Sequence, residues 1–512
     1  GKGGCFYIRG FHTVYSEKNQ FYKCKGRDVG GVMYLLDNGS INETTVNGQP
    51  VAQRTVTFKN DEYFGNRTER DGGAIAITGT SSKLIDVTIE NCNFENNYGK
   101  LESGAVWLNV VGNVTVKNSM FCGNTGNRRA GAIFIKGNPN GLLTVDGCYF
   151  SENTDNAMGS GAIFTEVPFD IKNCLFLNNK STGTEPAPDS KGGAISAEAK
   201  ARGSITNCKF VGNWSVGNGG AIFTTGSVMD VKLSNNFFQG NQAGLGGAVY
   251  NENAASKITM SNNQFTGNQA ANGGAVFIGL INTFVSDGDI YNENIANGAT
   301  DASGFGGAIR LRPNKIANVK ITNAKFVSNV AKNMNGGGAL WVQGINGNDK
   351  FAVDELSRCS FYNNQAYASG TTLSATAAGA DIFTDNKMYS QTNMSDCSVQ
   401  LAENSYNSHL VNAGGNNYSQ NTPIDVPEGG NGPLNPNDFN QTDCKAIIER
   451  PEIDVTPPHP EVTTGEVEPT HYKIYTACET DRPKWVKFES ESGQGPFTFT
   501  YDVFKTVGIT MT

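Results

Sequence analysis

The stretch 171–179 (Ile-Lys-Asn-Cys-Leu-Phe-Leu-Asn-Asn), followed after a variable loop by Gly192-Gly193-Ala194-Ile195, decides the fold of this chain. It contains an aromatic residue with Asn three positions later, and then a small residue, Gly, Ala and an aliphatic residue. Both patterns recur together ten times, with the second glycine at 73, 104, 131, 161, 193, 220, 247, 274, 307 and 338. A period of 27 to 33 residues is typical of a stacked repeat protein, in which each unit packs on its neighbours.

The apolar runs inside each unit are short and alternate with period 2, as in 205–210 (Ile-Thr-Asn-Cys-Lys-Phe). This pattern is typical of short, half-buried strands, and the frequent Gly and Asn residues disfavour helices. We therefore predict an all-β fold: a parallel β-helix of about 13 coils with three strands per coil, followed by a small C-terminal β appendage. The preference of parallel crossovers predicts a right-handed coil.

Composition divides the chain into five parts. We predict N-terminal capping coils over 1–54, regular repeats over 55–390 and degenerate terminal coils over 391–440, because the Gly-Ala pattern is lost there. No Asn occurs after 440, and the Pro-rich, acidic segment 441–470 indicates an extended linker. The alternating residues of 471–512 indicate a β appendage or an assembly arm that adds a strand to a partner.

The charge and hydropathy of the chain exclude several classes of protein. The net charge of −8 is spread along the sequence and gives no basic stripe for nucleic acid. No apolar run reaches the length of a transmembrane segment. The chain starts at Gly1 without an apolar leader, so we expect any targeting peptide to lie outside this sequence. No residue cluster indicates a metal site or a cofactor.

The residue after the aliphatic position of each repeat is predicted to point out of the coil, because Ser196 and Arg310 occur in this row and neither could stay unpaired in a dry core. Most other members are aromatic, and we interpret them as a candidate interaction surface for sugar rings or a partner protein. The row comprises Trp107, Phe134, Phe164, Phe223, Tyr250, Phe277 and Trp341. The other interpretation is an aromatic ladder that stabilises itself or is covered by a loop or by the C-terminal appendage.

Two further rows are predicted to face inward or to stack. The Asn residues at the turn before each aromatic residue are expected to form an amide ladder: Asn91, Asn118, Asn173, Asn207, Asn235, Asn262 and Asn323. Five cysteines share the inward slot two residues before the aromatic position: Cys92, Cys148, Cys174, Cys208 and Cys359. They are either buried free thiols or, in an oxidising compartment, disulfides between neighbouring coils, such as Cys148 with Cys174.

Other cysteines and the glycosylation sequons indicate features of the surface and the ends. Cys5 with Cys24, and Cys444 with Cys478, are candidate terminal disulfides. Asn-x-Ser/Thr sequons permit N-glycans on surface turns. They occur at Asn38, Asn42, Asn66, Asn113, Asn179, Asn213, Asn393, Asn417 and Asn440.

The combination of Gly-Gly-Ala-Ile with Phe-x-x-Asn resembles the polymorphic outer membrane protein repeat, known from chlamydial surface proteins. The resemblance covers about residues 55–390 and rests on ten paired copies. It implies a β-helical passenger that is extracellular or displayed on the cell surface, often as an adhesin or a coat protein.

The alternative is a carbohydrate-active β-helix enzyme, such as a polyuronate lyase or hydrolase, or a carbohydrate-binding protein. Asn153-Thr154-Asp155 matches one fragment of a hydrolase pattern, and all four histidines lie outside the regular coils. The best cluster for a lyase combines Arg310 and Arg312 with Asp287, Asp289 and Asp301. Acids and arginines this close usually form solvated pairs.

We therefore predict a protein that is not an enzyme. We expect a structural or adhesive solenoid, a subunit of a surface fibre or filament, located outside the cell or on its surface. Its expected partners are further copies of the chain, bound head-to-tail or through the C-terminal strand, and glycans or surface proteins of a host.

Overall fold

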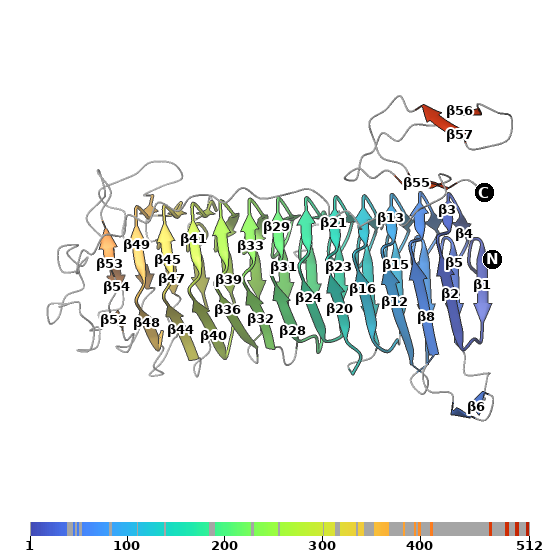
Figure 1. The fold of residues 1–512 in the computed structure, drawn as a ribbon. Helices are drawn as coiled ribbons and strands as arrows, with labels where there is room; N and C mark the ends of the chain where they lie inside the picture. The colour runs from blue at the N-terminus through green and yellow to red at the C-terminus, as the bar shows by residue number, and fades with distance from the viewer. Residues whose placement is uncertain are drawn as a thin grey trace.

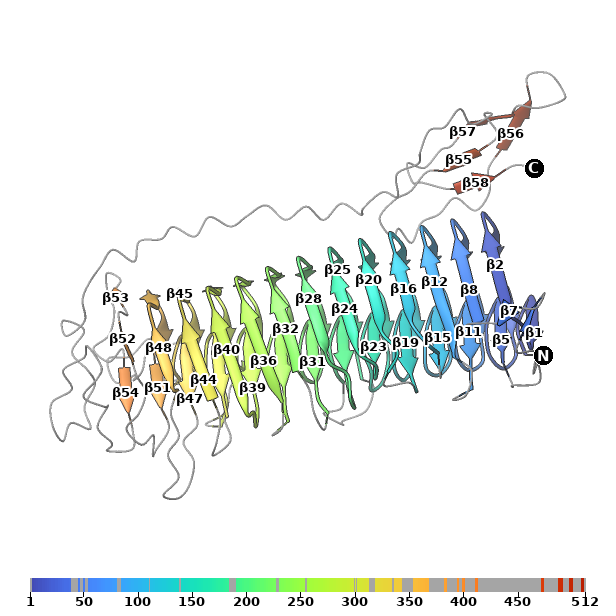
Figure 2. The ribbon, with the colours of Figure 1, turned by 60° about the horizontal axis from the view of Figure 1, so that its bottom comes forward.

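The chain winds into a stack of coils, and four parallel β-sheets run along this stack (Figure 1). Each regular coil adds one strand to each of the four sheets. In this computed structural model the description covers residues 2–367 except for 38–44, 47–48, 51–53, 81–83, 110, 138–139, 184–189, 227–229, 254–255, 299, 301, 313–317, 334–335 and 343–352. Beyond 367 it covers only 382–384, 394–395, 398–400, 410–412, 471–473, 487–490, 497–500 and 508–510. Figure 2 shows the same stack of coils from another direction.

Sheet A begins each regular repeat and contains the aliphatic residue that follows Gly-Ala. Its 14 strands, in spatial order, are β1 (Phe6–Arg9), β5 (Met33–Leu36), β11 (Ile75–Thr78), β15 (Val106–Asn109), β19 (Ile133–Lys136), β23 (Ile163–Thr165), β27 (Ile195–Ala197), β31 (Ile222–Thr224), β35 (Val249–Asn251), β39 (Val276–Ile278), β43 (Ile309–Leu311), β47 (Leu340–Val342), β51 (Ile382–Thr384) and β54 (Leu410–Asn412).

Sheet B follows sheet A in each coil and has the longest strands. Its 13 strands are β2 (Thr13–Glu17), β8 (Arg54–Lys59), β12 (Ile85–Glu90), β16 (Val114–Lys117), β20 (Leu143–Asp146), β24 (Phe169–Lys172), β28 (Gly203–Thr206), β32 (Asp230–Ser234), β36 (Lys257–Ser261), β40 (Thr283–Asp287), β44 (Asn318–Thr322), β48 (Glu355–Ser357) and β52 (Met394–Ser395).

Sheet C carries the repeated aromatic residue at the centre of three-residue strands. Its 13 strands are β3 (Gln20–Tyr22), β9 (Glu62–Phe64), β13 (Asn93–Glu95), β17 (Met120–Cys122), β21 (Tyr149–Ser151), β25 (Leu175–Leu177), β29 (Lys209–Val211), β33 (Phe237–Gln239), β37 (Gln264–Thr266), β41 (Ile290–Asn292), β45 (Lys325–Val327), β49 (Ser360–Tyr362) and β53 (Ser398–Gln400).

Sheet D follows the Asn of each repeat, mostly with two-residue strands. Its 12 strands are β4 (Lys25–Gly26), β10 (Arg67–Thr68), β14 (Tyr98–Gly99), β18 (Thr125–Gly126), β22 (Thr154–Asp155), β26 (Lys180–Ser181), β30 (Trp214–Ser215), β34 (Gln242–Leu245), β38 (Gln269–Asn272), β42 (Ile295–Ala296), β46 (Val330–Ala331) and β50 (Gln365–Ala366). The coil therefore has four strands and not the three expected. The sequence did not predict the fourth strand, because it is short and lies in the variable loop, where apolar and polar residues do not alternate.

Among the residues that the structure describes, three small antiparallel pairs lie outside the coils. They are β6 (Thr45–Val46) with β7 (Gln49–Pro50), β55 (His471–Lys473) with β58 (Gly508–Thr510), and β56 (Lys487–Ser490) with β57 (Phe497–Thr500). The last two pairs form the C-terminal β appendage. The described residues include no apolar helix of membrane-spanning length.

The repeated glycine pair follows from how closely the coils stack. Gly192 has φ of +60°, a conformation that is unfavourable for residues with a side chain. At the next residue, Gly193, a Cβ atom would overlap the carbonyl oxygen of Gly220 in the following coil. The second glycine of the motif is therefore needed for backbone contact between coils. In the coils that have a first glycine, such as Gly192, that residue provides the positive φ of the turn into sheet A.

The aromatic column of sheet C forms the centre of the core. Consecutive rings from Phe21 to Phe361 stack with centroids 4.5 to 5.1 Å apart and nearly parallel planes. Strand pairing sets this spacing, because residues in register on neighbouring parallel strands lie about 4.8 Å apart. Each ring therefore contacts the rings before and after it, in addition to the aliphatic residues of sheets A and B.

The amide ladder is formed by the Asn three residues after the aromatic position, and not by the turn Asn that the sequence suggested. At the turn, residues such as Asn173 and Asn207 have φ near +54° and are exposed. Asn tolerates this left-handed conformation, which explains its recurrence there. The ladder residues are buried and link successive coils: Asn66, Asn97, Asn124, Asn153, Asn179, Asn213, Asn241, Asn268, Asn294, Asn329 and Asn364.

Candidate functional site on the outer face of sheet A

The aromatic row lies outside the tube on sheet A. Its rings belong to two clusters that are separate from the main core: one includes Trp107, Phe134 and Phe164, and the other comprises Phe223, Tyr250 and Phe277. These rings are nevertheless buried, with exposures of 8% or less, and Trp341 is also buried. The row therefore does not form the open stacking platform that the sequence suggested.

The connection from sheet D to sheet A covers the rings. The Arg129 guanidinium lies 5.2 Å above the Phe164 ring, and the Lys191 ammonium lies 5.5 Å from the Phe223 ring. Phe305, in the connection before β43, stacks on Trp341 at 4.8 Å. These contacts are cation–π and aromatic interactions that stabilise the folded loop on the sheet. Use of the row as an interaction surface remains a prediction, and any partner would meet the covering groups first.

Charged side chains gather above the rings on the coils that contain β15 to β27. Glu102 accepts a hydrogen bond of 2.7 Å from Trp107 Nε1 and lies 3.6 Å from the Lys136 ammonium. Further along the sheet, Lys191 and Glu198 form an ion pair of 3.1 Å. The surface thus offers both charges close to aromatic rings, on strand β19 and in the connections next to β15 and β27.

Glu166 lies between these two ion pairs. It directly follows β23, and its backbone N–H donates to the carbonyl of Ile135 at 3.1 Å, which places it beside Lys136 on the neighbouring coil. Burial raises the pKa of the Glu166 carboxyl, and the nearby Glu198 and Glu102 raise it further, while Arg129 and Lys136 lower it. A half-buried carboxyl with a raised pKa, flanked by cations, is a candidate for proton transfer. Sequence reasoning missed this cluster because its members do not form a contiguous motif.

The other proposed cluster of acids and arginines is not assembled. Asp289 is fully buried at the turn between sheets B and C, whereas Arg310 lies on the outer face of sheet A over Phe277 and Trp341. Asp287 accepts hydrogen bonds from Thr322 and Asn323 on the next coil. Asp301 lies outside the described residues. The sequence analysis grouped these residues because they are close in the sequence. It could not show that they belong to different sheets of the coil.

The hydrolase-like fragment has a structural role. Asn153 belongs to the amide ladder. Asp155 is fully buried on sheet D, where one carboxylate oxygen accepts the backbone N–H groups of Gly159 and Ala157 at 2.7 and 3.1 Å. These bonds close the turn after β22, so the carboxylate does not face a surface from which a substrate could approach.

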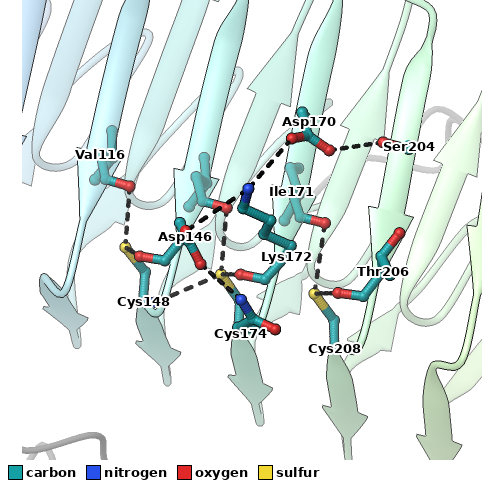
Figure 3. A network of polar contacts seen from close by, with 12 residues as sticks. Val116, Asp146, Cys148, Asp170, Ile171, Lys172, Cys174, Ser204, Thr206 and Cys208 are labelled. Atoms are coloured by element: carbon teal, nitrogen blue, oxygen red, sulfur yellow. Dashed lines mark hydrogen bonds and ion pairs between the residues drawn. The ribbon is translucent and has the colours of Figure 1, made fainter.

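The five inward cysteines are buried, and Cys148, Cys174 and Cys208 are free thiols. Figure 3 shows three of them on successive coils, each with its sulfur directed at backbone carbonyls. Cys174 Sγ donates to the carbonyl of Lys172 at 3.0 Å and accepts the backbone N–H of Cys148 at 3.4 Å. Burial raises the pKa of both thiols. The structure thus has thiols, and no Cys148–Cys174 disulfide, in this slot.

Cys5 and Cys24 are joined by a disulfide in the first coil. Cys444 and Cys478 lie outside the described residues. Cys24 occupies the ladder position of the first coil, where its backbone N–H donates to Asn66 Oδ1 at 2.9 Å.

The sequons divide by burial. Asn113 is exposed in the connection directly before β16, where it can accept a glycan. Three others are ladder residues with no exposed surface, and their amide nitrogens each donate two hydrogen bonds, so the folded chain cannot carry a glycan on Asn66, Asn179 or Asn213. The remaining sequons lie outside the described residues: Asn38, Asn42, Asn393, Asn417 and Asn440.

The fold and its repeated coil define a class of protein, the parallel β-helices. The family model described as right handed beta helix region matches residues 1–238 and 73–283, which together cover more than half of the chain. The chain therefore belongs to this family, and the predicted right-handed β-helix is confirmed. The narrower resemblance to the polymorphic outer membrane protein repeat has no such support.

One similar solved structure is a mannuronic acid specific polysaccharide family 6 lyase from human gut microbiota. The two chains are 11% identical, with a TM-score of 0.36, and the alignment covers 68% of this chain and 77% of the lyase. No curated protein is significantly similar to this chain in sequence.

The match contradicts the prediction that the protein is not an enzyme, because the similar structure is itself that of an enzyme. That prediction is corrected: the coil pattern gives no ground for excluding catalysis. The similarity is too weak to assign an activity to this chain, so its function has to be argued from its own residues.

Proposed function

We propose that the protein is an extracellular or cell-surface β-solenoid that acts as a structural or adhesive rod. The observation that carries this proposal is the unbroken amide ladder from Asn66 to Asn364. Each ladder Asn from Asn97 to Asn329 accepts two hydrogen bonds from the coil before it and donates to the coil after it. Because every regular coil is tied to the next in the same way, the molecule resists bending between coils.

The surroundings of the ladder support the same proposal. The aromatic column runs parallel to it, so polar and apolar contacts between coils continue without interruption. The Cys5–Cys24 disulfide fits an oxidising compartment, in which disulfides persist. The resemblance to the polymorphic outer membrane protein repeat agrees with display on a surface. Head-to-tail association, or addition of the C-terminal strands to a partner, would make such a rod the subunit of a fibre.

Electron microscopy of the purified full chain at increasing concentration tests the structural proposal. We expect stiff rods of uniform length that associate end to end. Rods that remain monomeric at high concentration would contradict the fibre, and flexible or collapsed particles would contradict the rod. Labelling of intact source cells with an antibody tests the location, because a signal that requires permeabilised cells contradicts surface display.

A second candidate function, binding or processing of an acidic polysaccharide, is favoured by the Glu166 cluster. The cluster places a carboxyl of raised pKa among Arg129, Lys136 and Glu198 above aromatic rings. Cations can bind the carboxylates of a uronate, and Glu166 can exchange a proton with the sugar.

The test uses a panel of uronate polymers, with and without calcium, to measure both binding and release of new chain ends. We expect Glu166→Gln to abolish any turnover and Lys136→Met to weaken binding. Glu90→Gln is the matched control, because Glu90 lies on sheet B in an exposed pair with Lys59. No binding and no turnover by the native chain, or equal loss in the control, would reject this function.

A further inference from the structure

Two coils depart from the repeat in the same way. The aromatic column contains Phe in the described coils from Phe21 to Phe361 except at Tyr63 and Tyr291. The slot two residues earlier holds Asp in those two coils, Asp61 and Asp289, and holds Cys, Ser, Asn or Ala in the others. The two exchanges therefore occur together, which indicates that the phenol and the carboxyl depend on each other.

The contacts around Asp289 form a closed hydrogen-bond chain inside the rod. Ser286 Oγ donates to Asp289 Oδ2 at 2.6 Å and lies 3.0 Å from the Tyr291 hydroxyl. Asp289 Oδ1 accepts the backbone N–H and the side-chain Nδ2 of Asn263 at 2.7 and 2.9 Å. Ser286, Asp289 and Tyr291 have no exposed surface.

The second cluster repeats this arrangement. The Tyr63 hydroxyl donates to Asp61 Oδ2 at 3.2 Å, and Ser16 donates to the same carboxyl. Asp61 Oδ1 accepts the backbone N–H of Asn19 at 2.8 Å, as Asp289 does from Asn263. The recurrence of serine, aspartate and tyrosine at two distant points shows that the cluster is a unit.

No cation faces Asp289 among the described residues. Its neighbours are Asn263 from the preceding coil, Ser286 on β40, Tyr291 on β41 and the exposed Asp287, whose charge acts against ionisation. On the following coil the same slot, two residues before the aromatic position, holds Ala324, which has no polar group to offer. An ionised Asp289 would thus be a buried charge that only hydrogen bonds stabilise, and such a charge is costly.

The hydrogen bonds of the cluster can form with Asp289 either ionised or neutral. With Asp289 ionised, two protons fill the two oxygen–oxygen contacts, from Tyr291 to Ser286 and from Ser286 to Asp289, and the cost is the buried charge. With Asp289 neutral, the charge is gone, and one hydroxyl proton has no acceptor within the cluster. The two states therefore have opposed costs, and a change of pH decides between them.

We propose that the Ser286–Asp289–Tyr291 cluster is a proton-controlled joint in the rod, in which the coils around β40 and β41 pack firmly when Asp289 is neutral and loosen when it is ionised. Burial raises the pKa of Asp289 to about 7, so the change occurs near neutral pH. The proposal concerns the interior of the β-helix and is independent of the structural and carbohydrate functions above.

Hydrogen exchange of the full chain tests the joint. The peptides that contain β40 and β41 are measured from pH 5 to pH 8, after correction for the intrinsic exchange rate. Because a neutral Asp289 stabilises the closed coils, their protection should fall by up to about tenfold per pH unit between pH 5 and 7 and level off above pH 7. The infrared band of the protonated Asp289 carboxyl in the folded chain should decrease around pH 7, at the pKa of the folded state.

Asp289→Asn is the main variant, because Asn fills the same slot at Asn236 and Asn263. We expect it to remove the additional pH dependence in these peptides and to reduce the titrating infrared band, to which Asp155 also contributes. Asp287→Asn is the control, and should retain both the pH dependence and the Asp289 contribution to the band, shifted to lower pH because the Asp287 charge no longer opposes ionisation of Asp289. Equal pH dependence in the native chain and in Asp289→Asn would overturn the proposal.

A second variant keeps the proposal falsifiable if Asp289→Asn does not fold. Tyr291→Phe restores the common residue of the column and removes one hydroxyl from the cluster. The ionised state loses the donor that supports it through Ser286, so the loss of protection should move to higher pH. An unchanged profile in Tyr291→Phe would contradict the proposed proton chain.

Discussion

Asn179 Oδ1 accepts both the backbone N–H of Asn153, at 3.1 Å, and the side-chain Nδ2 of Asn153, at 3.0 Å. The Nδ2 of Asn179 in turn donates to the carbonyl of Phe150, at 2.9 Å, and to the next ladder residue. One side chain is thereby hydrogen-bonded to buried polar groups on both the coil before it and the coil after it. The ladder thus stabilises the stack by removing unpaired groups from its interior.

The ladder makes a first prediction about stability. Asn179→Ala leaves the two donors of Asn153 and the carbonyl of Phe150 without these partners, and each unpaired buried group costs about 1–3 kcal/mol. We expect the free energy of unfolding to fall by about 3 kcal/mol or more, measured by denaturant titration. Asn173→Gly is the control, because that turn residue is exposed and has positive φ. An equal loss in both variants would contradict the role of the ladder.

Glycosylation gives a second prediction. When the chain is secreted from a eukaryotic host, Asn113 should carry a glycan, and the ladder residues Asn66, Asn179 and Asn213 should not, because their amides are buried and hydrogen-bonded. Mass spectrometry of peptides from the folded, secreted protein measures the occupancy of each sequon. Asn113→Gln should remove the modification at that position. A glycan on Asn179 in folded protein would contradict the structure.

The inward thiols provide a third prediction. They should not react with a thiol reagent in the native chain and should react after denaturation, since burial raises the pKa of Cys148 and Cys174 and blocks access. Cys174→Ser should be tolerated better than Cys174→Ala, because the slot must accept the N–H of Cys148 and serine fills it at Ser119. We expect a difference of about 1 kcal/mol in unfolding free energy between these variants. Equal stability would show that the hydrogen bond contributes nothing.

The buried carboxyl of Asp155 gives a fourth prediction, that the stability of the folded chain depends on pH. Burial raises the pKa of its carboxyl from 3.8 to about 7. Between these two values the folded chain holds a proton that the unfolded chain has released, so stability should fall as pH rises from about 4 to about 7 and stay constant above. Asp155→Asn should reduce this slope, measured as denaturant midpoint against pH. The exposed Asp170→Asn is the control, and a native slope that Asp155→Asn leaves unchanged would contradict the prediction.

The candidate site on sheet A shows how far sequence reasoning reaches. The row from Trp107 to Trp341 can be found because it recurs at one position of the repeat. Its burial cannot be found in this way, because Arg129 and Phe305 come from variable loops that have no common pattern. Glu166 was overlooked for a related reason: Glu102 lies two coils before it and Glu198 one coil after it, and only the register of the strands brings these carboxyls together.

The sequence by itself determined that this chain forms a parallel β-helix, because close stacking of coils requires Gly-Ala before each aliphatic strand and an aromatic residue at one fixed place. It also indicated which positions repeat. Only the tertiary structure decided which Asn forms the ladder. Asn173 and Asn179 occupy two positions that both recur as Asn from repeat to repeat, so the sequence does not distinguish them, whereas in the structure they differ in backbone conformation and burial. It likewise placed Asp289 in the core beside Tyr291, because the direction of a side chain at a turn depends on φ and on the neighbouring coils, which a one-dimensional pattern does not contain.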